Sequence, residues 1–453
     1  MSEAVRWDPI KKATTLEWLG TEVTQALAAR SSLERTWRRW LEQYRAPAIQ
    51  AQKQFPWEGA SNYVLPLTAI DVDQLHASFM QSIHATEEVW IVGALNERWI
   101  RAAKPIQDYL KFLDRAVLNM WSVNQRALLE LVKLVTCIYK TGWFYEQRSV
   151  HTYNDRGEVV RGSRITSRPF VDHVRLVDFL LPPYSYAVQV EEQGGAPWIG
   201  ERLRFRREQL EILATSSAPF LPTIDPAMLK LVLAFEEAAQ TEHDQKIQSL
   251  DYVKRAPQNI DFDKDSGTES TKGPAGSPAT TVREIELWEI HARLETTPGE
   301  WNDVIALYHH PTRRFLRSVL NYFVHGKRPY EVSRYFPGDG FYGIGVCEQK
   351  EMFQAYLSDL YNFTHDNVLL TNSRMFATRE GSSIGPGEPW YPGKVIVTQG
   401  PPQEDFMAIQ MGSTYADLPN LIGSIYQTGQ LRTGVSDLTT GNLQALPSRT
   451  PAT

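Results

Sequence analysis

The chain has 453 residues, of which 42% are hydrophobic and 22% charged, with 47 basic and 53 acidic side chains. This length and hydrophobic content suffice for two or three packed domains and exclude an intrinsically disordered chain. The net charge of −6 excludes the broad cationic surface with which proteins grip duplex DNA.

Cysteine usage and hydropathy indicate the compartment. Cys137 and Cys347 show neither metal-ligand spacing nor a secreted disulfide framework, so a reducing compartment is expected. Charged residues interrupt positions 1–12, where a signal peptide needs an apolar run. The most apolar long stretch, 127–145, contains three charged residues and falls short of the roughly 20 mostly apolar residues of a spanning helix. We therefore expect no membrane partner.

The first 140 residues have helical patterns. Apolar residues recur at three- and four-residue steps within 15–45, which predicts an amphipathic helix: Leu16, Leu19, Val23, Ala26 and Leu27. Residues 55–62 form a helix-breaking connector, and a second helical pattern begins at Ala69. Residues 102–139 fit two helices or one long broken helix equally well.

The next region alternates strands and helices. Residues 142–206 contain short β-prone pieces, 207–239 a helical stretch, and 256–281 a flexible loop rich in Gly, Pro, Ser and Asp. Residues 283–335 predict a small mixed sheet, with strands near 285–291, 303–307 and 312–322. The fold class is therefore α+β, and no internal repeat is evident.

Two possible metal sites are unconvincing. The acidic residues between Asp261 and Glu269 resemble a calcium loop, but Ser266 occupies the position that needs glycine, and Lys272 the position that needs glutamate. His309 and His310 are adjacent, so in a strand their rings point to opposite faces. We expect a solvated loop and strand-end histidines, without metal or cofactor.

A glycine turn at residues 341–346 precedes a long helix and could let a phosphate approach the helix N-terminus. The third glycine of a dinucleotide fingerprint is replaced by Glu348, and no P-loop lysine follows. A structural turn is the favoured interpretation. Catalytic serine elbows, paired-cysteine zinc patterns and His-Glu-x-x-His helices are also missing from the sequence, so we do not expect an enzyme.

The helix predicted from Glu348 to Arg374 has about 27 residues and would run about 40 Å. Its six charged residues sum to −2, and a weakly acidic stripe repels phosphate. The opposite face is predicted to hold the less polar side chains: Phe353, Leu357, Leu360, Thr364, Asn367 or Val368, and Thr371.

Several motifs occur in a telling order. Residues 326–330 read GKRPY and residues 337–345 read PGDGFYGIG, and the long helix that follows contains Asn362, Asp366 and Asn367. Earlier in the chain, 55–62 read FPWEGASN, and Val177-Asp178-Phe179 precedes Pro182-Pro183-Tyr184. In this order the chain resembles the portal proteins of short-tailed and related tailed bacteriophages.

The resemblance implies a ring-forming portal fold, typically of twelve subunits around a DNA tunnel. Its wing would be residues 1–342, the first stem helix 343–374, the clip 375–411 and the second stem helix 412–430. Residues 431–453 would hold the tunnel loop and the start of a returning wing segment. The family usually continues beyond such a segment into a further wing helix and a crown. Either the full protein is longer than this sequence or the portal lacks a crown, and we favour the first interpretation.

The resemblance also implies roles for particular residues. On the polar face of the first stem helix, the tunnel would be lined by Glu348, Glu351, Asp359 and Asp366. The tunnel loop would contain Arg432, Thr433, Ser436, Asp437, Thr439 and Thr440. In the clip, the residues that dock other proteins would be Arg379, Glu380, Glu388, Trp390, Tyr391 and Lys394.

The implied function is a non-enzymatic conduit for packaging and ejecting double-stranded DNA, without sequence preference. The implied partners are other copies of the chain, the terminase large subunit, a tail adaptor, the major capsid protein and scaffold. The protein would be found at the capsid portal vertex, and in the host cytoplasm during assembly. The alternatives are a nucleotide-dependent DNA-processing enzyme that uses the turn from Gly343 to Gly345, or another structural head-tail ring protein.

Overall fold

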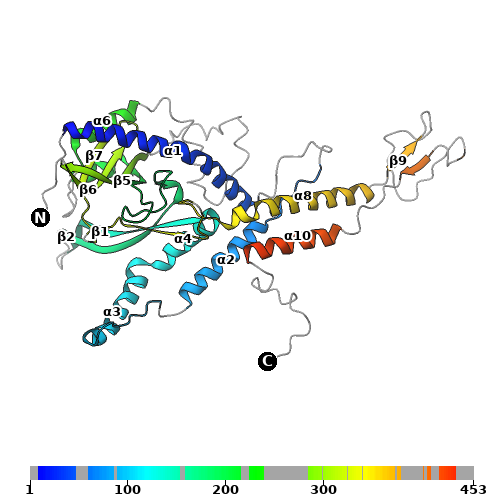
Figure 1. Cartoon of the computed structure of the whole chain (residues 1–453), viewed down its shortest axis with the longest axis horizontal. Coiled ribbons are helices and arrows are strands. Elements are labelled where there is room, and N and C mark those ends of the chain that lie inside the picture. Colours follow the sequence, from blue (N-terminus) through cyan, green and yellow to red (C-terminus); the bar gives the residue numbers. More distant parts are fainter. Residues whose placement is uncertain are drawn as a thin grey trace. The chain divides into compact units, whose positions relative to one another are not determined.

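The computed structural model describes residues 9–46, 60–85, 89–153, 159–215, 224–238, 284–297, 299–323, 325–338, 340–372, 375–378, 401, 406–409 and 418–434. The chain divides into two compact units, whose elements are labelled in Figure 1. Unit 1 contains Met1–Leu41 and Leu75–Gly345, and unit 2 contains Glu42–Gln74 and Val346–Thr453. Residues 42–74, which the predicted layout placed in the wing, thus group with the predicted stem.

A five-stranded antiparallel sheet forms the centre of unit 1, in the order β3-β4-β5-β6-β7. Its strands are Phe179–Leu180, Trp198–Arg206, Glu284–Thr297, Glu300–His309 and Arg314–Leu320. The α+β class is confirmed. The expected mixed sheet is wrong, because every pairing here is antiparallel. Short turns explain this for β5–β6 and β6–β7, since strands joined in that way can pair only antiparallel.

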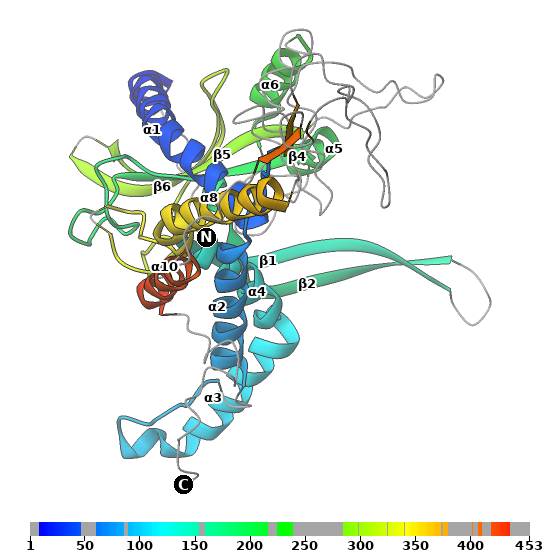
Figure 2. The ribbon, with the colours of Figure 1, turned by 90° about the vertical axis from the view of Figure 1, so that its right-hand side faces the viewer.

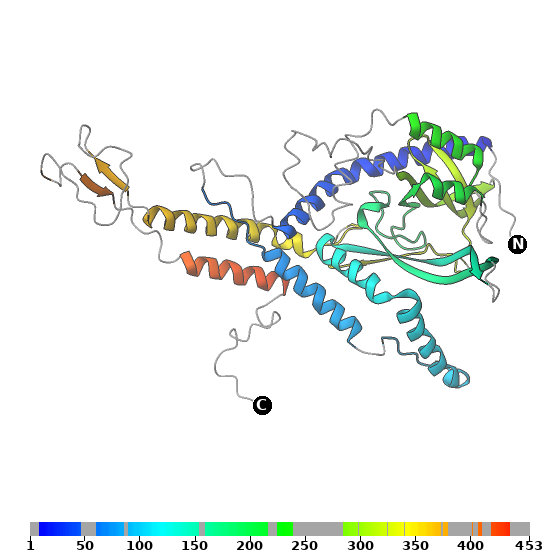
Figure 3. The same cartoon turned by 180° about the vertical axis from the view of Figure 1, so that it is seen from behind.

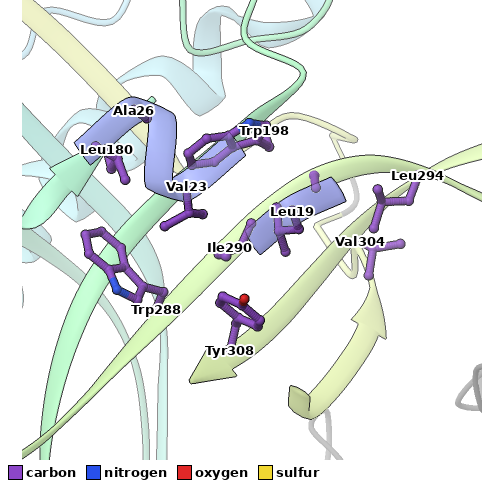
Figure 4. Packing of buried hydrophobic residues seen from close by; sticks show 11 residues of the cluster. Leu19, Val23, Ala26, Leu180, Trp198, Trp288, Ile290, Leu294, Val304 and Tyr308 are labelled. Atoms are coloured by element: carbon purple, nitrogen blue, oxygen red, sulfur yellow. The ribbon is translucent and has the colours of Figure 1, made fainter. Parts of the chain in front are cut away.

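Helix α1 (Pro9–Arg45) packs on this sheet through the predicted apolar stripe, as Figure 4 shows. Leu19, Val23 and Ala26 lie one or two helical turns apart and are buried with Trp198 and Trp288. Fully burying an aliphatic side chain of this size contributes about 1.5–3 kcal/mol. The N-terminal part of α1 is thus held in unit 1 mainly by apolar packing.

A second sheet in unit 1 has the order β2-β1-β8. Strands β1 (Thr136–Tyr153) and β2 (Val159–Val174) are long and pair from Ile138 to Tyr153 of β1. Strand β8 (Tyr330–Arg334) pairs only with residues 136–140 of β1. We had expected residues up to 335 to belong to one small sheet, but β8 joins β1 instead. Beyond residue 140 the hairpin extends from its unit as a two-stranded ribbon, visible in Figure 2.

The predicted helical stretch 102–139 is broken twice. Helix α3 (Ile100–Phe112) runs into a π-helix, η2 (Leu113–Leu118), and α4 (Met120–Leu134) follows after Asn119, which has a φ of 50°. Val135 has a φ of 71°, and β1 begins at Thr136. The expectation of helix up to residue 139 is therefore wrong, because the β-branched and aromatic residues from Thr136 to Tyr139 form a strand.

The helical stretch predicted over 207–239 is also interrupted. Helices α5 (Arg207–Thr215) and α6 (Pro226–Ala238) are separated at least by the non-helical residues Ile224 and Asp225. Proline disfavours helical geometry in the residue before it but fits the first turn of a new helix. Both helices pack on the sheet through the apolar cluster around Leu210 and Val232. The loop predicted at 256–281, with its acidic run, lies outside the described residues.

Unit 2 contains the long predicted helix. Helix α8 (Val346–Asn372) has 27 residues, and α10 (Leu418–Thr433) lies beside it, as Figure 3 shows. Strands β9 (Met375–Thr378) and β10 (Phe406–Ile409) form an antiparallel pair. The unit also contains the C-terminal turn of α1, residues 60–66 and the first half of α2 (Leu67–His84). Within the described part of the chain, the helices are all too short or too polar to cross a bilayer.

Candidate functional site

Helix α8 carries five buried polar side chains at intervals of four residues: Lys350, Gln354, Ser358, Asn362 and Asp366. Residues four apart lie on the same side of a helix, so these side chains form a slowly winding stripe, which we call the polar ladder. Each residue is only 3–6% exposed. Burying a polar group without a hydrogen bond costs about 1–3 kcal/mol, so each needs a partner.

The upper half of the polar ladder, which is its C-terminal part, accepts hydrogen bonds from alternate backbone amides of residues 60–66, the segment before α2. The bonds are Ser61 N–H to Asp366 Oδ1 at 2.8 Å, Tyr63 N–H to Asn362 Oδ1 at 2.8 Å, and Leu65 N–H to Ser358 Oγ at 3.1 Å. Asn362 also donates from Nδ2 to the carbonyl of Tyr63 at 3.0 Å. The side chains of α8 thus satisfy backbone hydrogen-bonding groups of this segment, as the backbone of a neighbouring β-strand would.

The match between helix and segment has a geometric origin. In an extended chain, amides two residues apart point to the same side and lie about 6.6–6.8 Å apart. Side chains four residues apart on an α-helix are separated by about 6 Å along its axis. The two repeats differ by only about a tenth, so three consecutive rungs can bond without distorting either partner.

Gln354 anchors the segment where it enters α2. Its Oε1 accepts the N–H of Thr68 at 2.8 Å, and its Nε2 donates to the carbonyl of Gln43 at 3.0 Å. The side chain of Gln43 in turn donates to Thr68 Oγ1 at 2.6 Å. Gln354 therefore joins the end of α1, the start of α2 and α8.

The lower end of the polar ladder is a buried ion pair. Lys350 Nζ lies 2.7 Å from Asp71 Oδ2, and the two side chains are 4% and 9% exposed. Thr433 Oγ1 of α10 donates to the same carboxylate oxygen at 3.2 Å. Gly429 brings α10 close to α8, since a Cβ there would lie 3.4 Å from Lys350 Nζ. Helices α2, α8 and α10 therefore meet at Asp71.

At the C-terminal end of the polar ladder, aromatic and imidazole rings contact one another beside the hydrogen bonds. Ser61 Oγ lies 2.7 Å from His365 Nδ1. The ring of Tyr63 packs edge-on against His365 and Tyr361, with centroid distances of 5.4 and 6.3 Å. These ring contacts add to the hydrogen bonds between α8 and the segment before α2.

The four predicted tunnel-lining residues on α8 do not share one environment. Glu348 and Asp359 are exposed and Glu351 is half-buried. Asp366 is buried and accepts the Ser61 amide, so its placement on an open polar face is wrong. The predicted apolar face is also only partly buried. Leu357 is buried; Phe353, Leu360, Thr364 and Asn367 are half-buried; Val368 and Thr371 are exposed.

The exposed side of α8 contains large apolar side chains. Met352, Tyr356 and Phe363 are 76%, 50% and 63% exposed, and their spacing places them on the same side of the helix as Glu348 and Asp359. Contiguous exposed apolar side chains commonly mark a protein interface. This side therefore combines an apolar strip with two carboxylates.

Helix α10 (Leu418–Thr433) extends three residues beyond residue 430, where the second stem helix was expected to end. Arg432 and Thr433 belong to α10, because that helix continues to Thr433; Arg432 is exposed and Thr433 is buried. Ser436, Asp437, Thr439 and Thr440 lie outside the described residues. The six predicted clip residues, Arg379, Glu380, Glu388, Trp390, Tyr391 and Lys394, also lie outside them, as does the strand expected at 394–398.

Other parts of the chain fill the space beside the glycine turn that precedes α8. Added Cβ atoms at Gly343 and Gly345 would lie 2.4 Å from the Phe336 carbonyl oxygen and the Val135 side chain, respectively. The amide of Gly343 donates to Thr136 Oγ1 at 3.3 Å, and that of Ile344 donates to the Phe336 carbonyl at 2.9 Å. Close packing thus explains both glycines, and these two amides are not directed at a phosphate.

Other residues singled out in the sequence make structural contacts. His309 is buried, with Nδ1 2.8 Å from Thr312 Oγ1 and Nε2 3.2 Å from Glu236 Oε1. Across the described ranges, no three metal-binding side chains come together. The Arg328 guanidinium donates to the carbonyls of Val188, Ala196 and Pro197 at 2.6–2.9 Å, so it fixes the loop before β4.

A second group of polar side chains lies between the two sheets of unit 1: Glu201, His291 and Tyr330 are buried, and the side chains of Lys140 and Glu289 are 15% and 17% exposed. We call it the ionic cluster: Lys140, Glu201, Glu289, His291 and Tyr330. Lys140 Nζ lies 2.5 Å from Glu201 and 2.7 Å from Glu289, and the Tyr330 hydroxyl donates to Glu201 at 2.7 Å. His291 Nε2 lies 3.3 Å from Glu289.

The charges of the ionic cluster are mutually stabilised. Burial alone would lower the pKa of Lys140, but the two glutamates hold that pKa above its ordinary value. Burial would likewise raise the pKa of Glu289, but Lys140 keeps it well below the usual range. Burial lowers the pKa of His291 and raises that of Tyr330. The cluster holds a fixed set of charges that joins β1, β4, β5 and β8.

Neither buried polar group was predicted. The four-residue repeat from Lys350 to Asp366 is visible in the sequence and is the signal that could have revealed the polar ladder. The ionic cluster has no such signal, since its members come from four separate strands.

Neither the models of known protein families nor the curated proteins contain a match to this chain.

Proposed function

We propose that this chain is a phage portal subunit. It would assemble as a ring, typically of twelve copies, at one capsid vertex and serve as the conduit for DNA packaging and ejection. The observation that carries the proposal is the polar ladder. It bonds Ser61, from the FPWEGASN motif, to Asp366, from the long-helix motif. Two of the segments on which the resemblance rests thus form one bonded element.

That element suits the wall of a channel. Helix α8 has 27 residues, about 40 Å at 1.5 Å per residue. The polar ladder braces one side of it by hydrogen bonds and an ion pair, whereas Glu348 and Asp359 are exposed. Exposed carboxylates repel phosphate, and a strongly basic wall would slow DNA by binding it. A weakly acidic wall would let duplex DNA pass with little friction.

The remaining assignments follow the same layout. On the exposed side of α8, Phe363 and Tyr356 lie about 60–80° round the helix axis from Glu348, at about 100° per residue. That edge, where the two side chains are 63% and 50% exposed, would pack against a neighbouring copy of the chain, while Glu348 and Asp359 face the channel. Residues 375–411, which include β9 and β10, would dock the terminase large subunit and later the tail adaptor. The wing would contact the major capsid protein and scaffold. No chemistry by the chain itself is required.

Electron microscopy and native mass spectrometry of the purified chain would test the proposal. We expect closed rings with a central hole that admits duplex DNA, and a mass near twelve times that of the 51.7 kDa chain. Phe363→Glu should reduce the fraction of rings at least tenfold, because it places a charge in the proposed subunit interface. Thr371→Glu, exposed on the same helix, is the matched control and should leave the rings intact.

Two outcomes would contradict the portal assignment. One is a stable monomer under all assembly conditions. The other is tight one-to-one binding of ATP or a dinucleotide, measured by titration calorimetry and lost in Gly345→Val, which would favour the enzyme alternative.

A further inference from the structure

The β1–β2 ribbon beyond residue 140 has no partner strand in the described part of the chain. Residues 142–153 pair with 159–170, whereas β8 stops opposite Lys140. Figure 2 shows the distal part of the ribbon apart from the helices and the five-stranded sheet of its unit. Two-stranded hairpins are marginally stable in water on their own. A ribbon this long therefore indicates a binding arm.

Arginines are concentrated on this arm. Arg148, Arg161 and Arg164 are exposed, and Arg148 stands directly opposite Arg164 in the antiparallel register. Like charges in a directly opposed pair destabilise a hairpin. Glu146 forms an ion pair with Arg148 at 2.6 Å, and no acidic side chain of the described residues is found to pair with Arg161 or Arg164. Glu146 thus offsets the charge of Arg148, whereas Arg161 and Arg164 have no acidic partner within the described residues and can accept an outside anion.

The arginines lie on both faces of the ribbon. Directly opposed residues share a face, so Arg148 and Arg164 are on one face. Arg161 is opposite His151, at odd spacing from the first pair, and so lies on the other face. A flat acidic surface would contact one face only. A groove with an anionic wall on each side would contact both.

The major groove of duplex DNA has this form, because it admits a two-stranded β-ribbon between two phosphate backbones. We propose that the ribbon binds the backbone of double-stranded nucleic acid by lying in a groove, with Arg148 and Arg164 toward one strand and Arg161 toward the other. The contacts are to phosphates, so binding is independent of base sequence.

The net charge of the arm is opposite in sign to the net charge of the whole chain. Residues 142–169 include five arginines and three acidic residues, a net of +2, whereas the whole chain carries −6. The proposed contact is thus local and separate from the α8 surface. It rests on the ribbon alone and does not require that the chain form a ring.

Fluorescence anisotropy with a labelled mixed-sequence duplex, titrated with the full chain at salt concentrations from about 50 to 200 mM, tests the proposal. We expect binding that weakens with salt and is equal for unrelated sequences. Replacing Arg148, Arg161 and Arg164 by Gln should weaken binding at least tenfold and flatten the log–log salt slope by about 2 to 3. The control replaces Arg206, Arg293 and Arg314, three exposed arginines of the five-stranded sheet, and should change neither quantity.

Arg164→Glu separates a binding role from a folding role. The new carboxylate faces Arg148, so amide exchange in residues 142–170 should slow while duplex binding weakens. Unchanged duplex binding in the triple variant, or an original chain that does not bind duplex, would overturn the proposal. Polyglutamate bound as tightly as the duplex would also overturn it, in favour of an acidic protein surface. Gel filtration of the same samples keeps the two proposals apart. A monomeric chain that binds duplex DNA through these arginines would refute the ring proposal and would leave the nucleic-acid proposal standing.

Discussion

The polar ladder of unit 2 and the ionic cluster of unit 1 both bury polar side chains, but they satisfy them differently. The middle rungs of the polar ladder, Gln354, Ser358 and Asn362, are neutral and bond mainly to backbone groups. The ionic cluster has one lysine between two glutamates, at 2.5 and 2.7 Å. The hydrogen bond of one neutral side chain can be removed without removing the others. Each charge of the ionic cluster, in contrast, is stabilised only while its partners are present.

The difference has a physical basis. Removing one neutral partner from a buried hydrogen bond leaves one or two unsatisfied groups, at about 1–3 kcal/mol for each group. Removing one partner of a buried charge set leaves an uncompensated charge, which costs about 3–5 kcal/mol. Unit 1 should therefore depend strongly on Lys140. Unit 2 should depend strongly on the Lys350–Asp71 pair, but only moderately on each neutral residue of the polar ladder.

The largest effect is expected for Lys140→Met. It leaves the buried Glu201 and the mostly buried Glu289 without their cation, so the free energy of unfolding of unit 1 should fall by about 3 kcal/mol, the lower end of the range for a fully buried charge. Urea denaturation followed by circular dichroism would measure it. The control is Lys104→Met, which breaks an ion pair whose side chains are 67% and 60% exposed and should change stability by less than about 0.5 kcal/mol.

A companion variant tests whether the charges act as one set. Changing Lys140 to Met and both glutamates to Leu removes the unpaired charges together, and it should recover most of the stability lost in Lys140→Met. If the single change costs less than about 1 kcal/mol, the cluster is not collective and the contrast with the polar ladder fails.

A smaller effect is expected for Asn362→Ala. It removes the acceptor of the Tyr63 amide and the donor to the Tyr63 carbonyl, so unit 2 should lose about 2–3 kcal/mol. Hydrogen exchange at the Tyr63 amide should accelerate more than exchange at Thr68, whose acceptor is Gln354. Asn367→Ala on the same helix should cost less than about 0.5 kcal/mol, because its side chain bonds only Thr371 in the described structure. Equal losses in the two variants would show that the polar ladder does not brace α8.

The sequence predicted the elements better than the contacts. Helix α8 begins two residues before the predicted start at Glu348, because helical spacing and the preceding glycine turn are local signals. Asp366 was misplaced because polar residues were assumed to face outward, and its partner, Ser61, is 305 residues away. Lys140 was placed just beyond a helix that in fact ends at Leu134. Its role depends on four strands whose pairing no local pattern encodes.

The smallest expected effect is a pH dependence to which the ionic cluster contributes through His291, alongside His310, whose pKa burial also lowers. Burial lowers the pKa of His291 below its ordinary 6.5, so below pH 6.5 the unfolded chain binds a proton that the folded chain does not. Stability therefore falls as the pH falls from 6.5, by at most about 1.4 kcal/mol per pH unit for this group. Below pH 4.5, the depressed pKa of Glu289 adds a loss of the same sign. Urea denaturation from pH 8 to pH 5 should show the slope, and His291→Gln should reduce it, leaving the part that comes from His310. An unchanged slope in that variant would mean that other groups control acid stability. In that case, the cluster would differ from the polar ladder in its charge but not in its response to pH.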